Sequence, residues 1–263
     1  MIAEAHAPDL RIPSKTFFAI IFEGRTGSSF VVSCLNSHPK ALCYPEVLQD
    51  LGARKQEKVL QLIVSGEPLE HFVPRAVQPA YFHGPVQPGP GLASVGFKTK
   101  LSDVCRLGWL GTALAEDDFR LVYLKRRNII KAVVSELNAN RLREKFGMGV
   151  SNARSEKQVL GPLHVDLGQL VAKLRRRIRR EEMHEEFYRK YTRHKIRLHY
   201  EDLLGDQSRF LARLLDFLEL DDQPMKGRFL KALPDRLREA IQNYQEVKHL
   251  LAGTHFEQLL DER

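Results

Sequence analysis

The chain contains 263 residues, of which 43% are apolar, and it carries a net charge of +8 and an isoelectric point near 9.4. This length can bury a large core, and the cationic surplus favours an anionic ligand without distinguishing a nucleotide, a polysaccharide or a nucleic acid. No apolar stretch approaches the ~20 residues of a membrane span and no signal-like run opens the chain, which predicts a cytoplasmic protein without a membrane span. Cys34, Cys43 and Cys105 lie in apolar contexts and are expected to be reduced core thiols, not disulfides or zinc ligands.

The first predicted strand, 16–22, leads into the most informative segment of the chain. Phe17–Phe22 is apolar without polar alternation, as in a strand buried on both faces, and a helix is predicted over 28–37. Between them lie a cation, two glycines and three hydroxyl residues: Gly24, Arg25, Thr26, Gly27, Ser28 and Ser29. A strand, a glycine-containing turn and a helix N-terminus direct several backbone N–H groups at one point, where the helix dipole also favours negative charge. The segment predicts a phosphate or sulfate site; the alternative is an ordinary strand-turn-helix corner.

This loop does not fit an ATPase. A P-loop has four residues between its glycines and then Lys and Ser/Thr, whereas Gly24 and Gly27 are three positions apart and no Lys follows. The strand predicted over 119–124 ends in Lys125-Arg126-Arg127 instead of a metal-binding Asp. The pattern favours an anion that is neutralised by protein cations, with no metal.

A candidate general base follows the first helix. Pro39 keeps His38 out of the helix, and a short apolar patch then ends in Glu46. A carboxylate beside an apolar patch and near an anion site has a raised pKa and can act as a general base. The alternative is a solvated loop carboxylate.

The other elements alternate along the chain. Strands are predicted over 16–22, 93–98, 119–124 and 196–200, and helices over 28–37, 54–65, 103–116, 128–143, 168–193, 206–219 and 236–252. This alternation predicts an α/β fold with three layers, a central parallel sheet flanked by helices. Residues 1–263 are expected to form one domain, with a flexible N-terminus over 1–15, a long surface loop over 74–91 and a mobile segment over 144–165.

Cationic groups follow three of the predicted strands. In parallel sheets ligands bind beyond the carboxyl ends of the strands, where the loop 24–29, Lys98 and Arg126-Arg127 all lie. Arg127 and Ser135, eight residues apart, are expected to hold one phosphate between a guanidinium and a hydroxyl, and Lys98 to neutralise a bridging oxygen. Taken singly, each is also compatible with a basic strand end or a tolerated helix serine.

The Arg-rich segment 173–195 is interspersed with four glutamates, Glu181, Glu182, Glu185 and Glu186. It predicts a long, mostly solvated helix with i,i+4 ion pairs, and the alternative is a polyanion-binding face.

With these residues in place, the chain resembles the sulfotransferases that use 3′-phosphoadenosine 5′-phosphosulfate (PAPS), in particular the bacterial and carbohydrate branch and the tyrosylprotein branch. The family's phosphosulfate loop, Arg-Ser/Thr-Gly-Ser/Thr-Ser/Thr, corresponds to Arg25–Ser29, and its Arg and Ser spaced by eight correspond to Arg127 and Ser135. Tyr200-Glu201-Asp202-Leu203 resembles the family's Tyr-Glu-Asp-Leu segment, and Asn243-Tyr244 more weakly resembles a C-terminal Asn-Tyr near the cofactor. The resemblance spans about 16–260 and is densest over 17–46 and 93–140.

The resemblance implies a P-loop-like fold, PAPS as co-substrate without a metal, and catalytic roles for Arg25, Lys98 and Glu46. It implies cofactor contacts from Arg25, Thr26, Gly27, Ser28, Ser29, Arg127, Ser135, Tyr200 and Asn243. The acceptor is expected to be a hydroxyl of a small molecule or glycan, most naturally a carbohydrate or glycoconjugate, and nucleic acid is not expected as a partner. The chain lacks the Lys-containing loop, the catalytic His and the Gly-rich Arg-Lys-Gly segment of the aryl and steroid branch.

Three alternatives stay open at this point. The first is a nucleotide or small-molecule kinase on a related scaffold. The second is a basic nucleic-acid-binding protein that uses the helix over 175–193, and the third is a catalytically silent protein of the same fold that binds polyanions. The oligomeric state and the acceptor itself cannot be read from the sequence.

Overall fold

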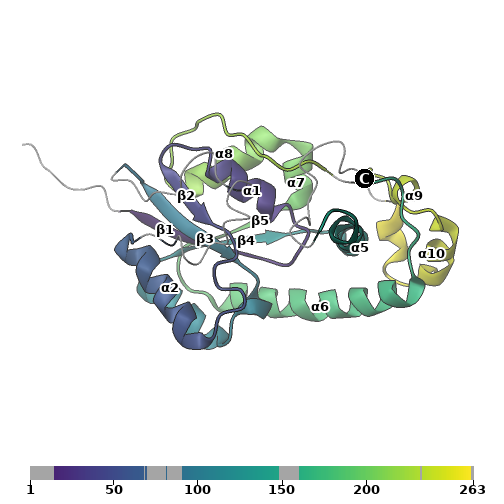
Figure 1. Ribbon diagram of the computed structural model, residues 1–263, viewed down its shortest axis with the longest axis horizontal. Coiled ribbons are helices and arrows are strands. Elements are labelled where there is room, and N and C mark those ends of the chain that lie inside the picture. Colours follow the sequence, from purple (N-terminus) through teal and green to yellow (C-terminus); the bar gives the residue numbers. More distant parts are fainter. Residues whose placement is uncertain are drawn as a thin grey trace, which may run out of the picture.

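A computed structural model describes residues 15–67, 69, 81, 91–147, 160–231 and 233–261 of the chain. The described residues form a five-stranded parallel sheet with helices on both faces (Figure 1). The strand order is β2-β3-β1-β4-β5, so β1 lies at the centre of the sheet between β3 and β4. The predicted three-layer α/β fold with a parallel sheet is confirmed.

The strands are β1 (Thr16–Phe22), β2 (Ala41–Tyr44), β3 (Ser94–Thr99), β4 (Arg120–Lys125) and β5 (Lys195–His199). The α-helices are α1 (Ser28–Leu35), α2 (Ala53–Ser65), α4 (Leu107–Glu116), α5 (Ile129–Phe146), α6 (Leu167–Lys190), α7 (Tyr200–Gly205), α8 (Gln207–Phe217), α9 (Leu237–Ala240) and α10 (Tyr244–Leu251). Short 3-10 helices cover η1 (Leu101–Asp103) and η3 (Glu257–Leu260).

The apolar run of β1 is buried because both faces of the sheet are covered. Successive strand side chains point to opposite faces, so Ala19 and Ile21 pack toward α2 and α4, whereas Phe18 and Ile20 pack toward α1 and α8. A third apolar cluster joins α5, α6, α9 and α10 beside the sheet (Figure 1). The sheet is therefore a rigid support, and the loops at its carboxyl edge are free to carry ligand-binding groups.

Several element predictions differ from the structure in instructive ways. The strand β2 was not expected, since Ala41–Tyr44 is only four residues long. The helix predicted over 236–252 is divided into α9 and α10, because Ile241 leaves the helix and forms a parallel bridge with Leu163. The polar stretch from residue 144 begins as the last turn of α5, which ends at Phe146, and most of 144–165 lies outside the described residues, as do the N-terminal segment 1–14 and nearly all of the loop 74–91.

The three cysteines are free, but they do not share one environment. Cys34 and Cys43 are buried, as expected, whereas Cys105 is exposed because it follows η1 in a surface turn. Across the described ranges, no helix combines the length and the apolar character that crossing a membrane requires.

Candidate active site

A cavity of about 540 Å³ lies at the carboxyl edge of the sheet, beyond the ends of β1 and β4. Its walls include the loop after β1, residues 131–143 on one side of α5, the start of α7, and residues 229–231 and 233–237. Seven of the residues predicted to form the site line it: Arg25, Gly27, Ser28, Ser29, Glu46, Ser135 and Tyr200. The fold thus brings together residues that are up to 175 positions apart in the chain, counting from Arg25 to Tyr200.

The loop after β1 has the backbone of an anion-binding turn. Arg25 adopts the left-handed conformation with φ 68°, and Gly27 adopts it with φ 77° directly before α1. No side chain caps this helix, so its first backbone N–H groups have no side-chain acceptor at Gly27. A Cβ atom at Gly27 would lie 2.7 Å from Cδ2 of Tyr200, so glycine is required both by φ and by the close approach of that ring.

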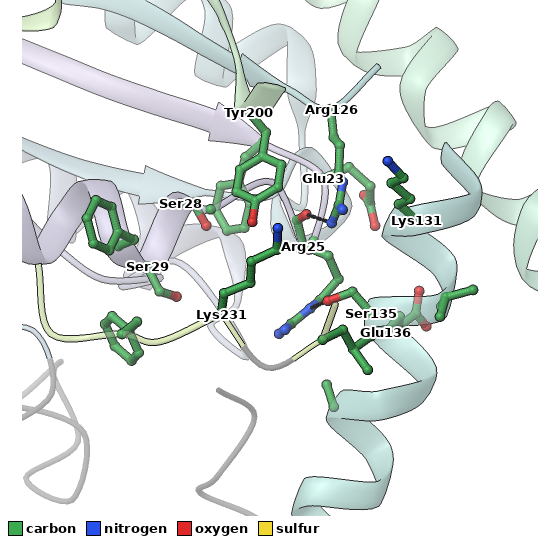
Figure 2. A pocket seen from close by; sticks show the side chains of 18 of the residues that line it. Glu23, Arg25, Ser28, Ser29, Arg126, Lys131, Ser135, Glu136, Tyr200 and Lys231 are labelled. Carbon is green, nitrogen blue, oxygen red and sulfur yellow. Dashed lines mark hydrogen bonds between the residues drawn. The ribbon is translucent and has the colours of Figure 1, made fainter. Parts of the chain in front are cut away.

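Arg25 lies at the centre of one half of the cavity (Figure 2). Its Nε donates to Oγ of Ser135 at 3.0 Å, which joins the loop to α5. Burial, followed by the nearby cation Arg126, lowers the pKa of Arg25 to about 10. A buried guanidinium crowded by a second one favours the arrival of an anion.

Arg126, the residue directly after β4, reaches the same half of the cavity. Its guanidinium donates to the carbonyl oxygen of Arg25 at 3.2 Å and lies 4.5 Å from the ring centroid of Tyr200. Its Nε is buried and has no hydrogen-bond partner among the described residues. Lys131, Arg143 and Lys231 also line this half, which is therefore strongly cationic.

Lys231 comes from the C-terminal segment that follows α8 and points into the cavity beside Arg25 and Tyr200 (Figure 2). It forms an ion pair with Asp235. Even so, partial burial and then the charges of Arg126 and Lys131 lower its pKa to about 8. Its protonation therefore responds to pH near neutrality.

The other half of the cavity holds a carboxylate between two lysines. Glu46 Oε1 lies 3.2 Å from Nζ of Lys98, and its Oε2 accepts from Nζ of Lys100 at 2.9 Å. Lys98 is fully buried and also donates to Oγ of Ser29 at 3.1 Å and to the Tyr81 hydroxyl at 3.3 Å. A loop hydroxyl, a cation and a carboxylate are thereby joined by successive contacts.

The environment of Glu46 reverses the predicted shift of its pKa. Burial alone would raise that pKa, as the sequence predicted, but the charges of Lys98 and Lys100 outweigh burial and lower it to about 2. Burial alone would conversely lower the pKa of Lys98, and Tyr81 and Glu46 raise it above its usual value. At neutral pH the group is therefore an ionised carboxylate held by two ammonium groups.

Four predicted site residues do not line the cavity, and one of them is the fully buried Lys98 described above. Arg127 is half-exposed and pairs with Asp202 at 2.8 Å, because the turn after β4 directs Arg126 inward and Arg127 outward. Asn243 instead ties α10 to residue 165, since its side chain accepts from Val165 N at 2.9 Å and donates to Val165 O at 3.0 Å. Thr26 is buried beneath the loop, and its Oγ1 has no hydrogen-bond partner in the described part of the chain.

The sequence did not point to several residues of the cavity: Tyr81, Lys100, Lys131, Arg143 and Lys231. Lys100 follows the predicted Lys98 by two positions, and this repeat of lysines at a strand end is a usable signal. The other four lie in segments whose approach to the loop depends on tertiary packing. Within the described ranges, no three His, Cys, Asp or Glu side chains cluster closely enough to hold a metal ion.

No protein-family model matches the chain, and no curated protein matches it. The solved structures to which this structure is similar include three sulfotransferases. The mouse sulfotransferase SULT7A1 complexed with PAP is 12% identical, with a TM-score of 0.45, and the match covers 81% of this chain and 64% of the mouse chain. The sulfotransferase from Alicyclobacillus acidocaldarius is 14% identical with a TM-score of 0.45, covering 94% and 96% of the two chains.

The third structure is the sulfotransferase domain from the curacin biosynthetic pathway, which is 17% identical with a TM-score of 0.39 and covers 80% of this chain and 77% of that domain. This chain thus spans less than two thirds of the mouse protein's length. All these TM-scores lie below 0.5, so the function proposed for this chain rests on its own residues.

Proposed function

We propose that this protein is a PAPS-dependent O-sulfotransferase. The single observation that carries the proposal is the continuous set of contacts from the anion-binding loop through Lys98 to Glu46. The same cavity also contains the Arg25–Ser135 pair. One end of the cavity therefore has a cation and a carboxylate beside the loop, Lys98 and Glu46. The other end has the group of cations around Arg25 and Arg126.

The residues present fit the two anionic ends of PAPS. The loop 24–29 and the N-terminus of α1 suit the phosphosulfate end. Arg126, whose Nε has no partner among the described residues, suits the 3′-phosphate together with Ser135 and Lys131. Arg127, which the spacing to Ser135 suggests for this role, would first have to leave Asp202.

When bound, PAPS supplies a sulfuryl group that can be transferred to a hydroxyl. Transfer of this kind resembles phosphoryl transfer, in which positioning and electrostatics provide most of the catalysis. Ser28, Ser29 and the loop N–H groups hold the reacting end, and Arg25 and Lys98 stabilise negative charge on the bridging oxygen. Glu46 takes the proton that the acceptor hydroxyl loses.

The low pKa of Glu46 is compatible with the role of general base because Lys98, which lowers it, is shared between Glu46 and the anion-binding loop. In the free protein Lys98 contacts both Glu46 and Ser29, so it lies between the base and the loop. Negative charge that develops beside the loop would draw Lys98 toward Ser29 and away from Glu46, and the carboxylate would then become more basic. The base is thus strengthened as the acceptor proton is released.

We propose a neutral, polar acceptor, most naturally the hydroxyl of a carbohydrate or glycoconjugate. The charges around Glu46 balance, since two ammonium groups, Lys98 and Lys100, face two carboxylates, Glu46 and Asp103. An acceptor with a charge of its own would disturb this balance, whereas hydroxyl groups can hydrogen-bond to both signs.

The test is transfer of labelled sulfate from PAPS to a panel of carbohydrate, lipid, phenol and peptide-tyrosine acceptors. Labelled product from a hydroxyl acceptor supports the proposal, and its loss in Glu46→Gln supports the assigned base. Magnesium-dependent ATP turnover without sulfate transfer would instead favour a kinase. Steeply salt-dependent DNA binding without PAPS binding would favour a nucleic-acid-binding protein.

A further inference from the structure

The long helix α6 runs beneath the sheet toward α9 and α10 and has a face in direct contact with the anion-binding loop (Figure 1). Arg177, Arg180 and His184 are spaced by three and four residues and therefore lie on one side of the helix. We call these three residues the loop-facing side of α6. Neither their sequence spacing nor the Arg-rich composition of the segment distinguishes them from the solvated arginines around them.

Each of these residues contacts a different, consecutive residue at the end of β1. Arg177 donates to the carbonyl oxygen of Gly24 at 2.7 Å, and Arg180 donates to the Glu23 carboxylate at 3.0 Å. His184 places Nε2 3.0 Å from the carbonyl oxygen of Phe22 and Nδ1 2.7 Å from Arg180 O, and a neutral imidazole can donate through one of these nitrogens. With Arg126 bonded to the carbonyl oxygen of Arg25, the four residues Phe22–Arg25 are each held from outside the loop.

These contacts determine which way the loop amides face. In a planar trans peptide the C=O and the following N–H point in opposite directions. When Arg177 holds the carbonyl of Gly24 and Arg126 holds that of Arg25, the N–H groups of Arg25 and Thr26 are directed to the opposite side. The same contacts retain Arg25 in its left-handed conformation, which is unfavourable for a residue with a Cβ atom.

The helix is mostly solvated, as predicted, and Arg177 and His184 are its buried polar exceptions. Arg177 is 3% exposed and His184 is fully buried, stacked on the ring of Tyr123. Burying a guanidinium is costly unless it is well paired, and Arg177 has Glu181 at 2.9 Å as its counter-ion on the same helix. Burying a charged group at this depth costs more free energy than burying an apolar side chain would. Because the guanidinium is bonded to a loop carbonyl, its presence points to a role in shaping the loop.

We propose that the loop-facing side of α6 positions the anion-binding loop, so that its amides and Arg25 are arranged for the ligand before the ligand arrives. Arg177, Arg180 and His184 are positioning residues: they hold Phe22–Gly24, and Arg25 and the hydroxyls of α1 make the contacts to the anion. The identity of that anion as PAPS rests on the proposed function, but the arrangement of the loop does not.

The test compares Arg177→Gln with Arg179→Gln, a matched control on the opposite, exposed side of the same helix. Amide hydrogen exchange over residues 22–30 is measured without nucleotide, and 3′-phosphoadenosine 5′-phosphate (PAP) binding is measured separately by calorimetry. In Arg177→Gln we expect the amide exchange rate over 22–30 to rise about tenfold, because one hydrogen bond from a charged donor is lost. The exchange rates in β4 and α8 should not change. Arg177→Lys retains a charged donor and should restore part of the protection.

In turnover assays Arg177→Gln should raise the KM for PAPS much more than it lowers kcat, because the bound ligand restores the loop arrangement. If Arg177→Gln does not fold, Arg180→Gln serves instead, since Arg180 is about one third exposed and its side chain bonds Glu23. Because Arg180 also lines the cavity, only amide exchange measured without nucleotide is compared for this variant. Unchanged exchange over 22–30 in the folded variant, or an equal change in Arg179→Gln, overturns the inference. Altered exchange in a protein that binds no PAP would retain the positioning role and reject the proposed function.

Discussion

Arg126 and Arg127 are adjacent, and the structure separates their roles. The spacing to Ser135 predicts Arg127 as the phosphate ligand, whereas Arg126 is the residue that lines the cavity. We therefore expect Arg126→Gln to weaken PAP binding and Arg127→Gln to leave it nearly unchanged. The pair is a matched comparison, because both changes remove one positive charge at the same turn.

The expected magnitudes follow from burial. Arg126 is 8% exposed, so a hydrogen bond from its guanidinium to a phosphate is worth about 1.5–3 kcal/mol, or roughly 10- to 100-fold in the dissociation constant. The side chains of Arg127 and Asp202 are 50% and 37% exposed, and a surface pair of this kind contributes about 0–1 kcal/mol to stability. Arg127→Gln should accordingly alter PAP affinity by less than about twofold.

The assay is calorimetric titration of the wild type and both variants with PAP at one salt concentration, because affinity for polyanions depends on salt. Thermal unfolding of the same samples tests whether Arg126→Gln disturbs the loop through its bond to Arg25 O. Arg126→Lys, which retains the charge, should lose less affinity than Arg126→Gln. A large loss in Arg127→Gln with little change in Arg126→Gln would refute the structural assignment and restore the prediction from spacing.

Three further outcomes are expected. Glu46→Gln should keep PAP affinity and lose about 100-fold or more in turnover. The pKa of Glu46 is held near 2, below its ordinary value of 4.5, so the stability that its ionised form contributes should be present above pH 4.5 and disappear as the pH falls toward 2. Urea unfolding of the wild type at several pH values can follow this loss. Gly27→Ala should destabilise the fold by about 1–3 kcal/mol and weaken PAP binding, because of its φ and the contact with Tyr200. Gly24→Ala, which has open space around the added Cβ atom, is the control for stability alone, because Gly24 lines the cavity. PAP affinity should fall about tenfold between pH 7 and pH 9, because Lys231 loses its proton near pH 8. Lys231→Arg, which stays charged, should show little change in affinity over this range. An equal decline in the wild type and in Lys231→Arg would exclude Lys231 as the cause.

The loop after β1 could be predicted because its signal is local. A continuous apolar run, glycines, hydroxyls and a following apolar helix determine the turn, and the structure has β1 over the predicted residues and α1 beginning where it was expected. The parallel sheet likewise follows from the alternation of strands and helices. Strand ends are local features too, which is why Lys98 was found beside the loop.

The parts that could not be predicted depend on contacts between distant segments. Spacing selects Arg127, but which of two adjacent arginines faces the cavity depends on the turn after β4, where Asp202 binds Arg127. Arginine occupies every position from 175 to 180 except 178, so Arg177 and the exposed Arg179 look alike until α6 is packed against the loop. The pKa of Glu46 was predicted in the wrong direction because neither Lys98 nor Lys100 was expected to lie beside its carboxylate.

The proposal that one cavity holds both anionic ends of PAPS can be tested most directly by calorimetric titration of the wild-type protein with PAP and with adenosine 5′-phosphate, which lacks the 3′-phosphate. We expect PAP to bind at one site per chain and adenosine 5′-phosphate to bind at least about tenfold more weakly, since it cannot reach the cations around Arg126. Absence of PAP binding, or equal affinity for the two nucleotides, would contradict the two-ended site.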